Sequence, residues 1–249
     1  MIAFLYDTGF FILVQGLALA LLVFSVYRGS WKRLSAPLGY VFGLLLIDGV
    51  GRRYVLHRYG LTSEQYSSFY WLTDVALALG AFLVVCALFH RACAHDRKMW
   101  RFVRLVMACV FILVLGISLS ALTRSSAHVE NAHLQKVFFF EFQQNLYFTC
   151  LVLNTLLYIM MQQFELADPE LNLLVCGMGL QFAGPAANFA LASLTPWQYA
   201  SKLYDLFGPL CTLGMLAVWF YAVSRIPKPA PARARGKLVP ILARSRSAA

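Results

Sequence analysis

Seven apolar segments of membrane-spanning length divide the 249-residue chain. They lie at 9–27, 38–58, 69–90, 103–123, 137–162, 171–194 and 204–224. A helix needs about 20 apolar residues to cross a hydrocarbon layer about 30 Å thick, and each segment reaches this length. Only 13% of the residues are charged and 60% are hydrophobic, which leaves too little polar surface for a soluble domain of this size. The sequence therefore predicts an all-α, polytopic membrane protein with seven transmembrane helices.

The basic residues of the loops predict the orientation of these helices. Seven crossings place the two termini on opposite sides, and the side that carries more Lys and Arg is expected to be cytoplasmic. With the N-terminus outside, fifteen of the 21 Lys and Arg residues lie on the inner side and six on the outer side. The inner loop at 163–170 is the exception, because it is acidic. Acidic residues weigh little in this rule, so we expect an N-out, C-in topology.

The chain is expected to form one transmembrane domain, 1–225, followed by a basic tail at 226–249. The tail has four prolines, six Lys or Arg residues and no apolar periodicity. This composition predicts a disordered cytoplasmic segment that can lie on anionic lipid. The net charge of +10 comes largely from the loops and this tail. No ordered basic surface with base-stacking aromatic residues is visible, so nucleic-acid binding is not expected.

The second apolar segment carries charges in its own sequence. Asp48, Arg52 and Arg53 all lie within 38–58, and without its charged end this segment would be too short to span a membrane. A charge inside hydrocarbon is costly and by default has a partner within the helical bundle. Asp48 and Arg52 are four residues apart, so they can pair on one helix face. We expect these two residues to face the interior and Arg53 to reach the headgroups.

Other helices are expected to bring polar residues to the same depth, in the outer half of the membrane. Asp74 lies near the outer start of the third segment, and Glu141 and Asn145 form a polar stripe near the outer start of the fifth. Together they predict a polar pocket that opens outward. The predicted ligand-binding residues are Asp48, Arg52, Asp74, Glu141, Asn145, Gln181 and Asn188.

The sixth segment differs from its neighbours. Pro185 removes a helix hydrogen bond and is expected to bend the helix, so that Gln181 and Asn188 line a cavity. The alternative is that this helix is only closely packed and kinked. Three small residues at intervals of four permit a close approach to another helix. They are Gly179, Ala183 and Ala187.

The sequence gives no support for an enzyme, a cofactor or a metal site. A retinal protein needs a lysine near the middle of the seventh helix, whereas Lys202 precedes that helix. His57 and His90 lie at helix ends, where they cannot hold a haem between facing helices. The six cysteines include no CxxC pair, which argues against a zinc site or a disulfide framework. No nucleophile motif of the GxSxG type and no phosphate-binding glycine loop is present.

Three stretches of the chain show a resemblance to known proteins. These are FYWLTDVALALGAF at 69–82, FEFQQNLYFTCLVLNTLLYIMMQQF at 140–164 and GLQFAGPAANFALASL at 179–194. They resemble a family of small bacterial seven-helix membrane proteins, which share an acidic residue shortly before NLYF-like sequence in the fifth helix. The resemblance implies a multi-pass protein of the bacterial inner membrane. It implies no activity and assigns no role to Glu141 or Asn145.

Three functions are compatible with these features. The leading interpretation is a non-enzymatic membrane protein with an outward-facing polar pocket, either sensor-like or an accessory subunit of a membrane complex. In that interpretation Arg52 recognises a small polar or anionic ligand, Asp48 orients Arg52, and a protein partner in the membrane or cytoplasm carries the output. The first alternative is a small solute or proton-linked transporter, which is disfavoured because the bent sixth helix has no counterpart in the first half of the chain. The second alternative is a purely structural helical bundle.

Overall fold

The computed structural model describes residues 2–31, 33–60, 63–94, 97–125, 131–164, 168–194 and 197–225, and the side chains of 9–31, 33–60, 63–94, 97–120, 138–164, 168–188 and 207–225. Every regular element in these ranges is a helix, so the predicted all-α class is confirmed. The predicted tail at 226–249 lies outside the described residues.

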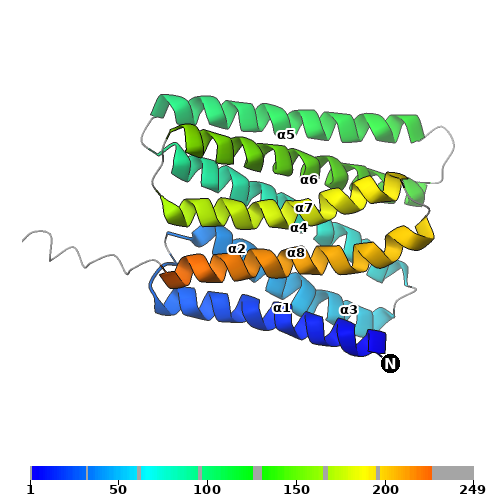
Figure 1. Ribbon diagram of the computed structural model, residues 1–249. Helices are drawn as coiled ribbons and strands as arrows, with labels where there is room; N and C mark the ends of the chain where they lie inside the picture. Colours follow the sequence, from blue (N-terminus) through cyan, green and yellow to red (C-terminus); the bar gives the residue numbers. More distant parts are fainter. Residues whose placement is uncertain are drawn as a thin grey trace, which may run out of the picture.

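The described chain forms seven consecutive helical rods that run side by side along one long axis (Figure 1). The rods are α1 (Ile2–Tyr27), the continuous α2 (Ser35–Leu44), η1 (Leu45–Gly51) and α3 (Arg52–Tyr59), α4 (Glu64–Ala92), α5 (Arg97–Ser125), α6 (Asn131–Gln163), α7 (Pro169–Leu194) and α8 (Trp197–Arg225). Each rod contains one of the seven predicted apolar segments and extends beyond it by a few residues.

The surface of the bundle is suited to lipid. Five helices contain a described stretch that is long and apolar enough to cross a membrane, namely Gly9–Tyr27, Glu64–Ala92, Arg97–Ser120, Phe138–Gln163 and Phe207–Arg225. Large apolar side chains point outward from these helices; Val23 is 61% exposed, Leu83 is 64% exposed and Ile112 is 66% exposed. Apolar surface of this extent is stable against lipid and not against water. The protein is therefore a helical membrane protein.

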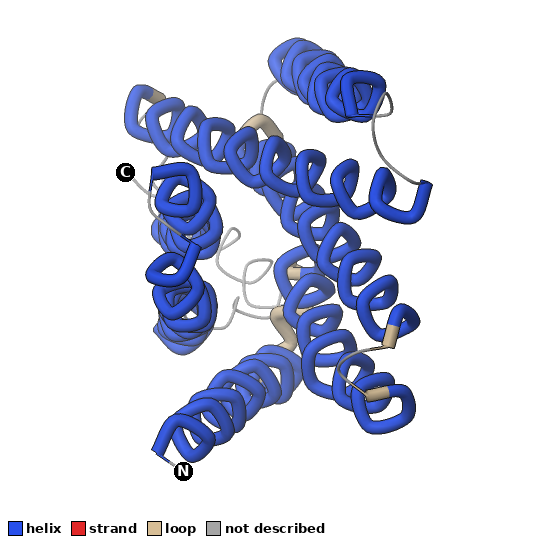
Figure 2. The backbone as a smooth tube through the Cα atoms, turned by 90° about the vertical axis from the view of Figure 1, so that its right-hand side faces the viewer, coloured by secondary structure: helices blue, strands red, loops and turns tan. Residues whose placement is uncertain are grey.

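Six of the seven rods form a closed ring, and α5 lies outside it (Figure 2). Around the ring, α1 packs on α2 and η1, α2 and α3 pack on α4, α4 on α6, α6 on α7, α7 on α8, and α8 on α1. The outlying α5 packs on α6 and, over a shorter length, on α4. Fully buried side chains from different rods form one core, among them Leu21, Leu146 and Phe182.

The second rod contains a π-helical turn, η1, between two α-helical parts. Two of its residues are glycines that allow other side chains to approach closely. A Cβ added to Gly49 would lie 3.1 Å from Oε1 of Gln15 on α1, and one added to Gly51 would lie 3.3 Å from Cζ of Phe69 on α4. Single π-helical turns inside α-helices occur frequently at functional sites. Asp48 lies in this turn, directly before Gly49.

Two glycines form the seam between α7 and α8. A Cβ added to Gly177 would lie 2.5 Å from Nε1 of Trp219, and one added to Gly184 would lie 2.9 Å from Sγ of Cys211. The two glycines are seven residues apart, which places them on the same face of α7 two turns apart. The indole of Trp219 is 1% exposed and donates a hydrogen bond to the carbonyl oxygen of Leu174 at 3.1 Å.

The small residues singled out in the sequence do not make this seam. Gly179 approaches α6 instead, where an added Cβ would lie 3.1 Å from Nδ2 of Asn154. Ala183 is exposed. Gly179 therefore makes the predicted close approach, to α6, whereas Ala183 does not, because the helix presents different small residues to its two neighbours.

The substitution Gly177→Ala is expected to lower the free energy of unfolding by about 2 kcal/mol, since overpacking a filled core costs about 1–3 kcal/mol. The new methyl group meets a rigid, buried indole, so the helices must separate. Thermal unfolding in mild detergent should show a fall in Tm of roughly 4–8 °C. Gly116→Ala is the matched control, because nothing lies within 4 Å of its added Cβ. An equal fall in both variants would contradict the seam.

Candidate functional site

Three charged residues predicted as site residues meet in the interior of the bundle. Arg52, the first residue of α3, places Nη1 2.9 Å from Oδ1 of Asp48 in η1. Its Nη2 lies 2.7 Å from Oδ1 of Asp74 on α4. The three side chains are 17%, 31% and 16% exposed, respectively, so water reaches them only in part. The predicted pairing of Asp48 with Arg52 and the predicted nearness of Asp74 are both present.

The Nε donor and the flat face of the Arg52 guanidinium also have partners within the protein. Its Nε donates a hydrogen bond to Oγ1 of Thr73 at 3.3 Å. Its guanidinium carbon lies 4.2 Å from the centroid of the Tyr70 ring, which is a cation–π contact. The neighbouring Arg53, in contrast, is exposed and stacks on Phe11 at 3.8 Å. All three guanidinium nitrogens of Arg52 are therefore already engaged.

The fourth member of the cluster is Gln143 on α6, which the sequence did not single out. Its Nε2 donates a hydrogen bond to Oδ2 of Asp74, and its side chain is 4% exposed. We call Asp48, Arg52, Asp74 and Gln143 the Asp48 cluster. The signal for Gln143 was its position seven residues before Cys150, which places it on the buried stripe of α6.

The predicted stripe of Glu141 and Asn145 lies on another face of α6. These residues flank Gln143 by two positions on either side, which turns each about 200° around the helix from it. Nδ2 of Asn145 donates a hydrogen bond to Oγ of Ser118 on the outlying α5, at 3.3 Å. Glu141, one turn earlier, is partly buried. The structure therefore separates this stripe from the Asp48 cluster, because helical rotation aims it at a different neighbour.

Gln181 and Asn188 of α7 are both buried, at 7% and 4% exposure. Nε2 of Gln181 donates a hydrogen bond to Oη of Tyr40 on α2 at 3.4 Å. Tyr40 lies about two helical turns before Asp48 on the same rod, so Gln181 reaches the rod that carries Asp48 through this tyrosine. The Tyr40 ring packs against Gly80 on α4, where an added Cβ would lie in van der Waals contact with the ring at 3.4 Å.

The charge of the Asp48 cluster is unbalanced. Asp48 and Asp74 together carry two carboxylates, and Arg52 supplies one guanidinium, which leaves a formal charge of −1. Each unpaired charge in a low-dielectric interior raises the free energy of the folded state. The cluster can therefore attract a positive group and disfavours a negative one.

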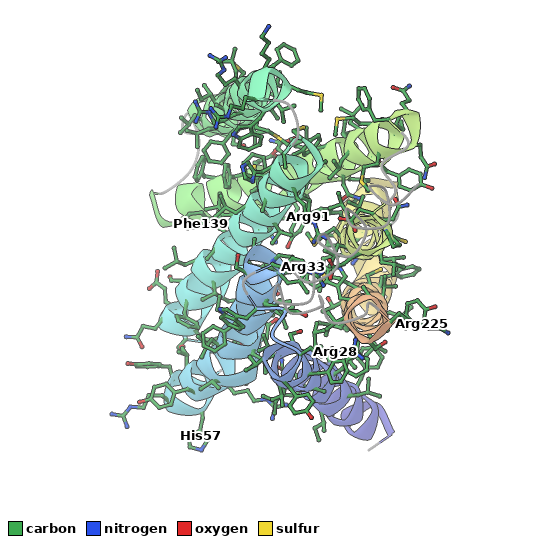
Figure 3. The ribbon with its side chains drawn as sticks, turned by 90° about the vertical axis from the view of Figure 1, so that its left-hand side faces the viewer. Arg28, Arg33, His57, Arg91, Phe139 and Arg225 are labelled. Carbon is green, nitrogen blue, oxygen red and sulfur yellow. The ribbon has the colours of Figure 1, made fainter. Side chains whose placement is uncertain are left out.

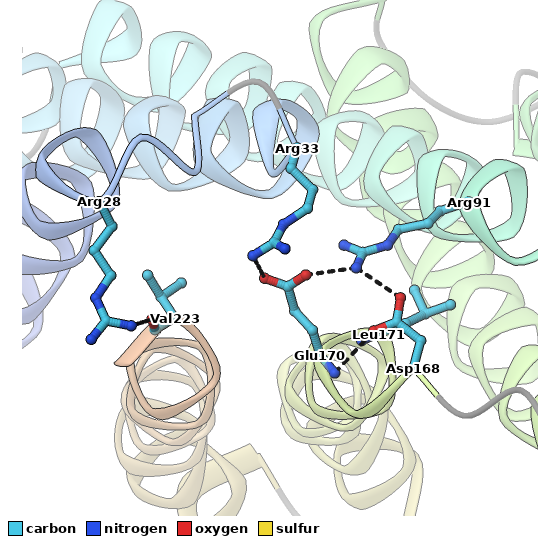
Figure 4. Close-up of polar contacts among 7 residues, drawn as sticks. All are labelled: Arg28, Arg33, Arg91, Asp168, Glu170, Leu171 and Val223. Atoms are coloured by element: carbon cyan, nitrogen blue, oxygen red, sulfur yellow. Dashed lines mark hydrogen bonds and ion pairs between the residues drawn. The ribbon is translucent and has the colours of Figure 1, made fainter. Parts of the chain in front are cut away.

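A second ionic network lies at the opposite end of the bundle, where α1, α4 and α8 end and α2 and α7 begin. Figure 3 looks onto this end, where Arg28, Arg33, Arg91 and Arg225 are gathered. Glu170 in the first turn of α7 is 2% exposed. Its Oε1 and Oε2 lie 2.6 Å from Nη2 of Arg33 and Nη2 of Arg91, respectively (Figure 4).

Asp168 completes this network, which we call the Glu170 network. It pairs with Arg91 at 2.8 Å, and its Oδ1 accepts hydrogen bonds from the backbone N–H groups of Glu170 and Leu171 (Figure 4). Such acceptance at a helix start is an N-cap. The two acidic residues come from the loop that departs from the charge rule of the sequence. Their pairing with Arg33 and Arg91 explains why this basic end of the bundle tolerates an acidic loop.

Comparison of the chain with family models, curated proteins and solved structures gives no match. Among the described residues, no group of three or more His, Cys, Asp and Glu side chains is arranged to hold a metal ion. The role of the Asp48 cluster is therefore inferred from its own contacts and charges.

Proposed function

We propose that this protein is a non-enzymatic, multi-pass membrane protein whose Asp48 cluster binds a small positively charged group, and that a partner protein reads the bound state. The chain is then a sensor-like module or an accessory subunit of a membrane complex. The observation that carries the proposal is that two carboxylates, Asp48 and Asp74, share the single guanidinium of Arg52. A cation or a proton that enters the cluster neutralises the excess carboxylate.

A positive ligand fits this site better than the anionic ligand expected from the sequence. Arg52 directs Nη1, Nη2 and Nε at Asp48, Asp74 and Thr73, so binding an anion would require it to leave these partners. The excess carboxylate would also repel the anion, and Coulomb repulsion is strong where water is partly excluded.

Buried hydrogen-bond acceptors near the Asp48 cluster also favour a positively charged ligand. Among the described residues, the buried Oε1 atoms of Gln181 and Gln15 have no hydrogen-bond partner. Gln181 bonds to Tyr40, about two helical turns before Asp48 on the same rod, and Gln15 lies against Gly49 in the π-helical turn that carries Asp48. Buried acceptors are normally satisfied by a donor or by an ion. A cationic group in this region would meet carboxylate and amide oxygens from different helices.

The protein is proposed to lie in the bacterial inner membrane with its N-terminus outside and its C-terminus inside, as the charge rule predicts. In this topology the Glu170 network lies on the cytoplasmic side. Basic side chains at this end of the bundle support the orientation. The two acidic residues there, Asp168 and Glu170, do not argue against it, because both form ion pairs with arginines. Protease should remove the tail at 226–249 in inside-out vesicles and leave it intact in right-side-out vesicles. The reverse pattern would overturn this topology.

The ligand sign can be tested on the purified full chain by thermal unfolding in mild detergent. Chlorides of sodium, potassium and small organic amines are titrated, and a bulky organic cation keeps the ionic strength constant. We expect one of these cations to raise Tm saturably, because a ligand at 100 times its Kd stabilises the folded state by about 2.7 kcal/mol. Asp74→Asn removes the excess charge and should abolish this response.

Glu64→Gln is the control, because Glu64 is exposed in the first turn of the same helix as Asp74. It should keep the cation response of the wild-type chain. Proton binding is measured in the same preparation as proton uptake by a pH-sensitive dye. Absence of both a saturable cation response and Asp74-dependent proton uptake would refute a positive ligand.

A small cation- or proton-linked transporter is the second candidate, and the π-helical turn favours it. Transporters often carry irregular helices in both halves of the chain. The first half has η1 at Leu45–Gly51, and the second half has Pro185 inside α7. Net uptake of the stabilising cation into vesicles that contain the reconstituted protein would favour this candidate. Binding without uptake would favour the sensor-like or accessory role.

A further inference from the structure

The surface is hollowed where α4 ends and α5 begins, at the same end of the bundle as the Glu170 network. The hollow has a volume of about 590 Å³. Six residues line it, namely His90, Cys93, Ala94, Arg97, Trp100 and Arg101. We call it the α4–α5 hollow. It is remote from the Asp48 cluster and plays no part in the function proposed above.

The charge of the hollow is positive and uncompensated within the described chain. Arg97 and Arg101 are both exposed and are four residues apart, a spacing at which like charges repel along one helix face. They also lie in the first turns of α5, where the helix dipole is positive and disfavours cations. Among the described residues, neither arginine forms an ion pair, whereas nearby Arg91 is held by Asp168 and Glu170.

The remaining lining is typical of headgroup depth. Trp100 packs edge-on against His90, with ring centroids 4.5 Å apart. Tryptophan is enriched where membrane helices leave the hydrocarbon, because its ring is apolar and its N–H is polar. Cys93 is 1% exposed, and the membrane-spanning stretches that end at Ala92 and begin at Arg97 flank the hollow. The hollow therefore combines Cys93, Ala94 and Trp100 with two arginine side chains, next to the ends of two stretches that are apolar enough to span a membrane.

We propose that the α4–α5 hollow binds the phosphate headgroup of an anionic phospholipid. Arg97 and Arg101 can each present a forked pair of N–H donors to phosphate oxygens, a geometry that suits guanidinium better than ammonium. The bound phosphate would offset both the repulsion between the two arginines and their conflict with the helix dipole. Trp100 would lie beside the glycerol backbone, and the acyl chains would run along the exposed apolar faces of α4 and α5. Basic recesses between membrane helices are known to favour such lipids.

The proposal can be tested by native mass spectrometry of the full chain in mild detergent. Phosphatidylglycerol and phosphatidylcholine with identical acyl chains are titrated separately. We expect the wild-type protein to prefer phosphatidylglycerol, and the double variant R97Q/R101Q to bind it roughly tenfold to thirtyfold more weakly. The variant should fold, because it removes two charges from an unfavourable position. The double variant R97K/R101K should keep a large part of the affinity.

The control is R58Q/R225Q, which removes the same charge from exposed arginines outside the hollow, one of them at the same end of the bundle. It should change the affinity less than twofold. A photoactivatable phosphatidylglycerol should label the peptide at 90–101 in the wild-type protein and not in R97Q/R101Q. Equal losses in the two glutamine variants, or unchanged affinity in R97Q/R101Q, would overturn the site. Displacement of the lipid from this peptide by millimolar inorganic phosphate would assign the hollow to a free anion instead.

Discussion

Replacing Arg52 with glutamine is expected to lower the free energy of unfolding by about 3 kcal/mol, because removal of one partner from a buried ionic group typically costs 3–5 kcal/mol. The lower end applies because the side chains of Asp48 and Asp74 are 31% and 16% exposed. Without the guanidinium the two carboxylates repel each other, and Thr73 and Tyr70 lose their contacts with Arg52. The Tm measured in mild detergent should fall by roughly 6–12 °C.

Arg53→Gln is a matched control, since it makes the same change at the adjacent position. Arg53 is exposed and its described contact is the stacking on Phe11, so a loss below about 1 kcal/mol is expected. The double variant R52Q/D74N removes a positive and a negative charge together and should be less destabilised than the sum of the two single variants. Strictly additive losses would mean that Arg52 and Asp74 do not interact.

Glu170→Ala should produce an effect of similar size at the other end of the bundle. Glu170 is 2% exposed and contacts both Arg33 and Arg91 at 2.6 Å, so its removal leaves two guanidinium groups without their shared carboxylate. Arg91 keeps Asp168, and Arg33, whose side chain is 39% exposed, can turn toward water. Because both arginines can still be stabilised in this way, the expected loss in the free energy of unfolding is only about 3 kcal/mol. Thermal unfolding in detergent measures the loss.

Glu64→Ala controls for the helix position, because Glu64 is also in the first turn of a helix but is exposed. An acidic residue there contributes up to about 1 kcal/mol through the helix dipole. The difference between the two variants therefore isolates the ion pairs of the Glu170 network. If Glu64→Ala and Glu170→Ala were equally stable, the network would contribute nothing beyond the dipole.

The local features of the Asp48 cluster could be predicted from the sequence. Asp48 and Arg52 are four residues apart in one helix, and their placement inside an apolar segment requires a buried partner. Asp74 was expected at the same depth because depth follows directly from the number of residues along a straight helix. These inferences need only the helix rise and the cost of a charge in hydrocarbon.

The rotation of each helix about its axis could not be predicted. Gln143, not Glu141 or Asn145, reaches Asp74, and Asn145 instead contacts Ser118 on α5. The two contacts differ because α6 packs on α4 with one face and on α5, outside the ring, with another. Each of these neighbours presents a polar side chain to α6. In the same way, Gly177 and not Gly179 packs against Trp219 of α8. Spacing along one helix cannot show which face meets which neighbour.

The sequence by itself determined the class of the protein, the approximate positions of its seven helices and the burial of a charged pair in the second of them, because hydrophobicity and helix geometry act locally. Only the tertiary structure decided which charges share a partner. It gave Arg52 two carboxylates and Glu170 two arginines. The ligand sign proposed for the Asp48 cluster depends on that count, since the net charge of a site is a sum over residues that are far apart in the chain.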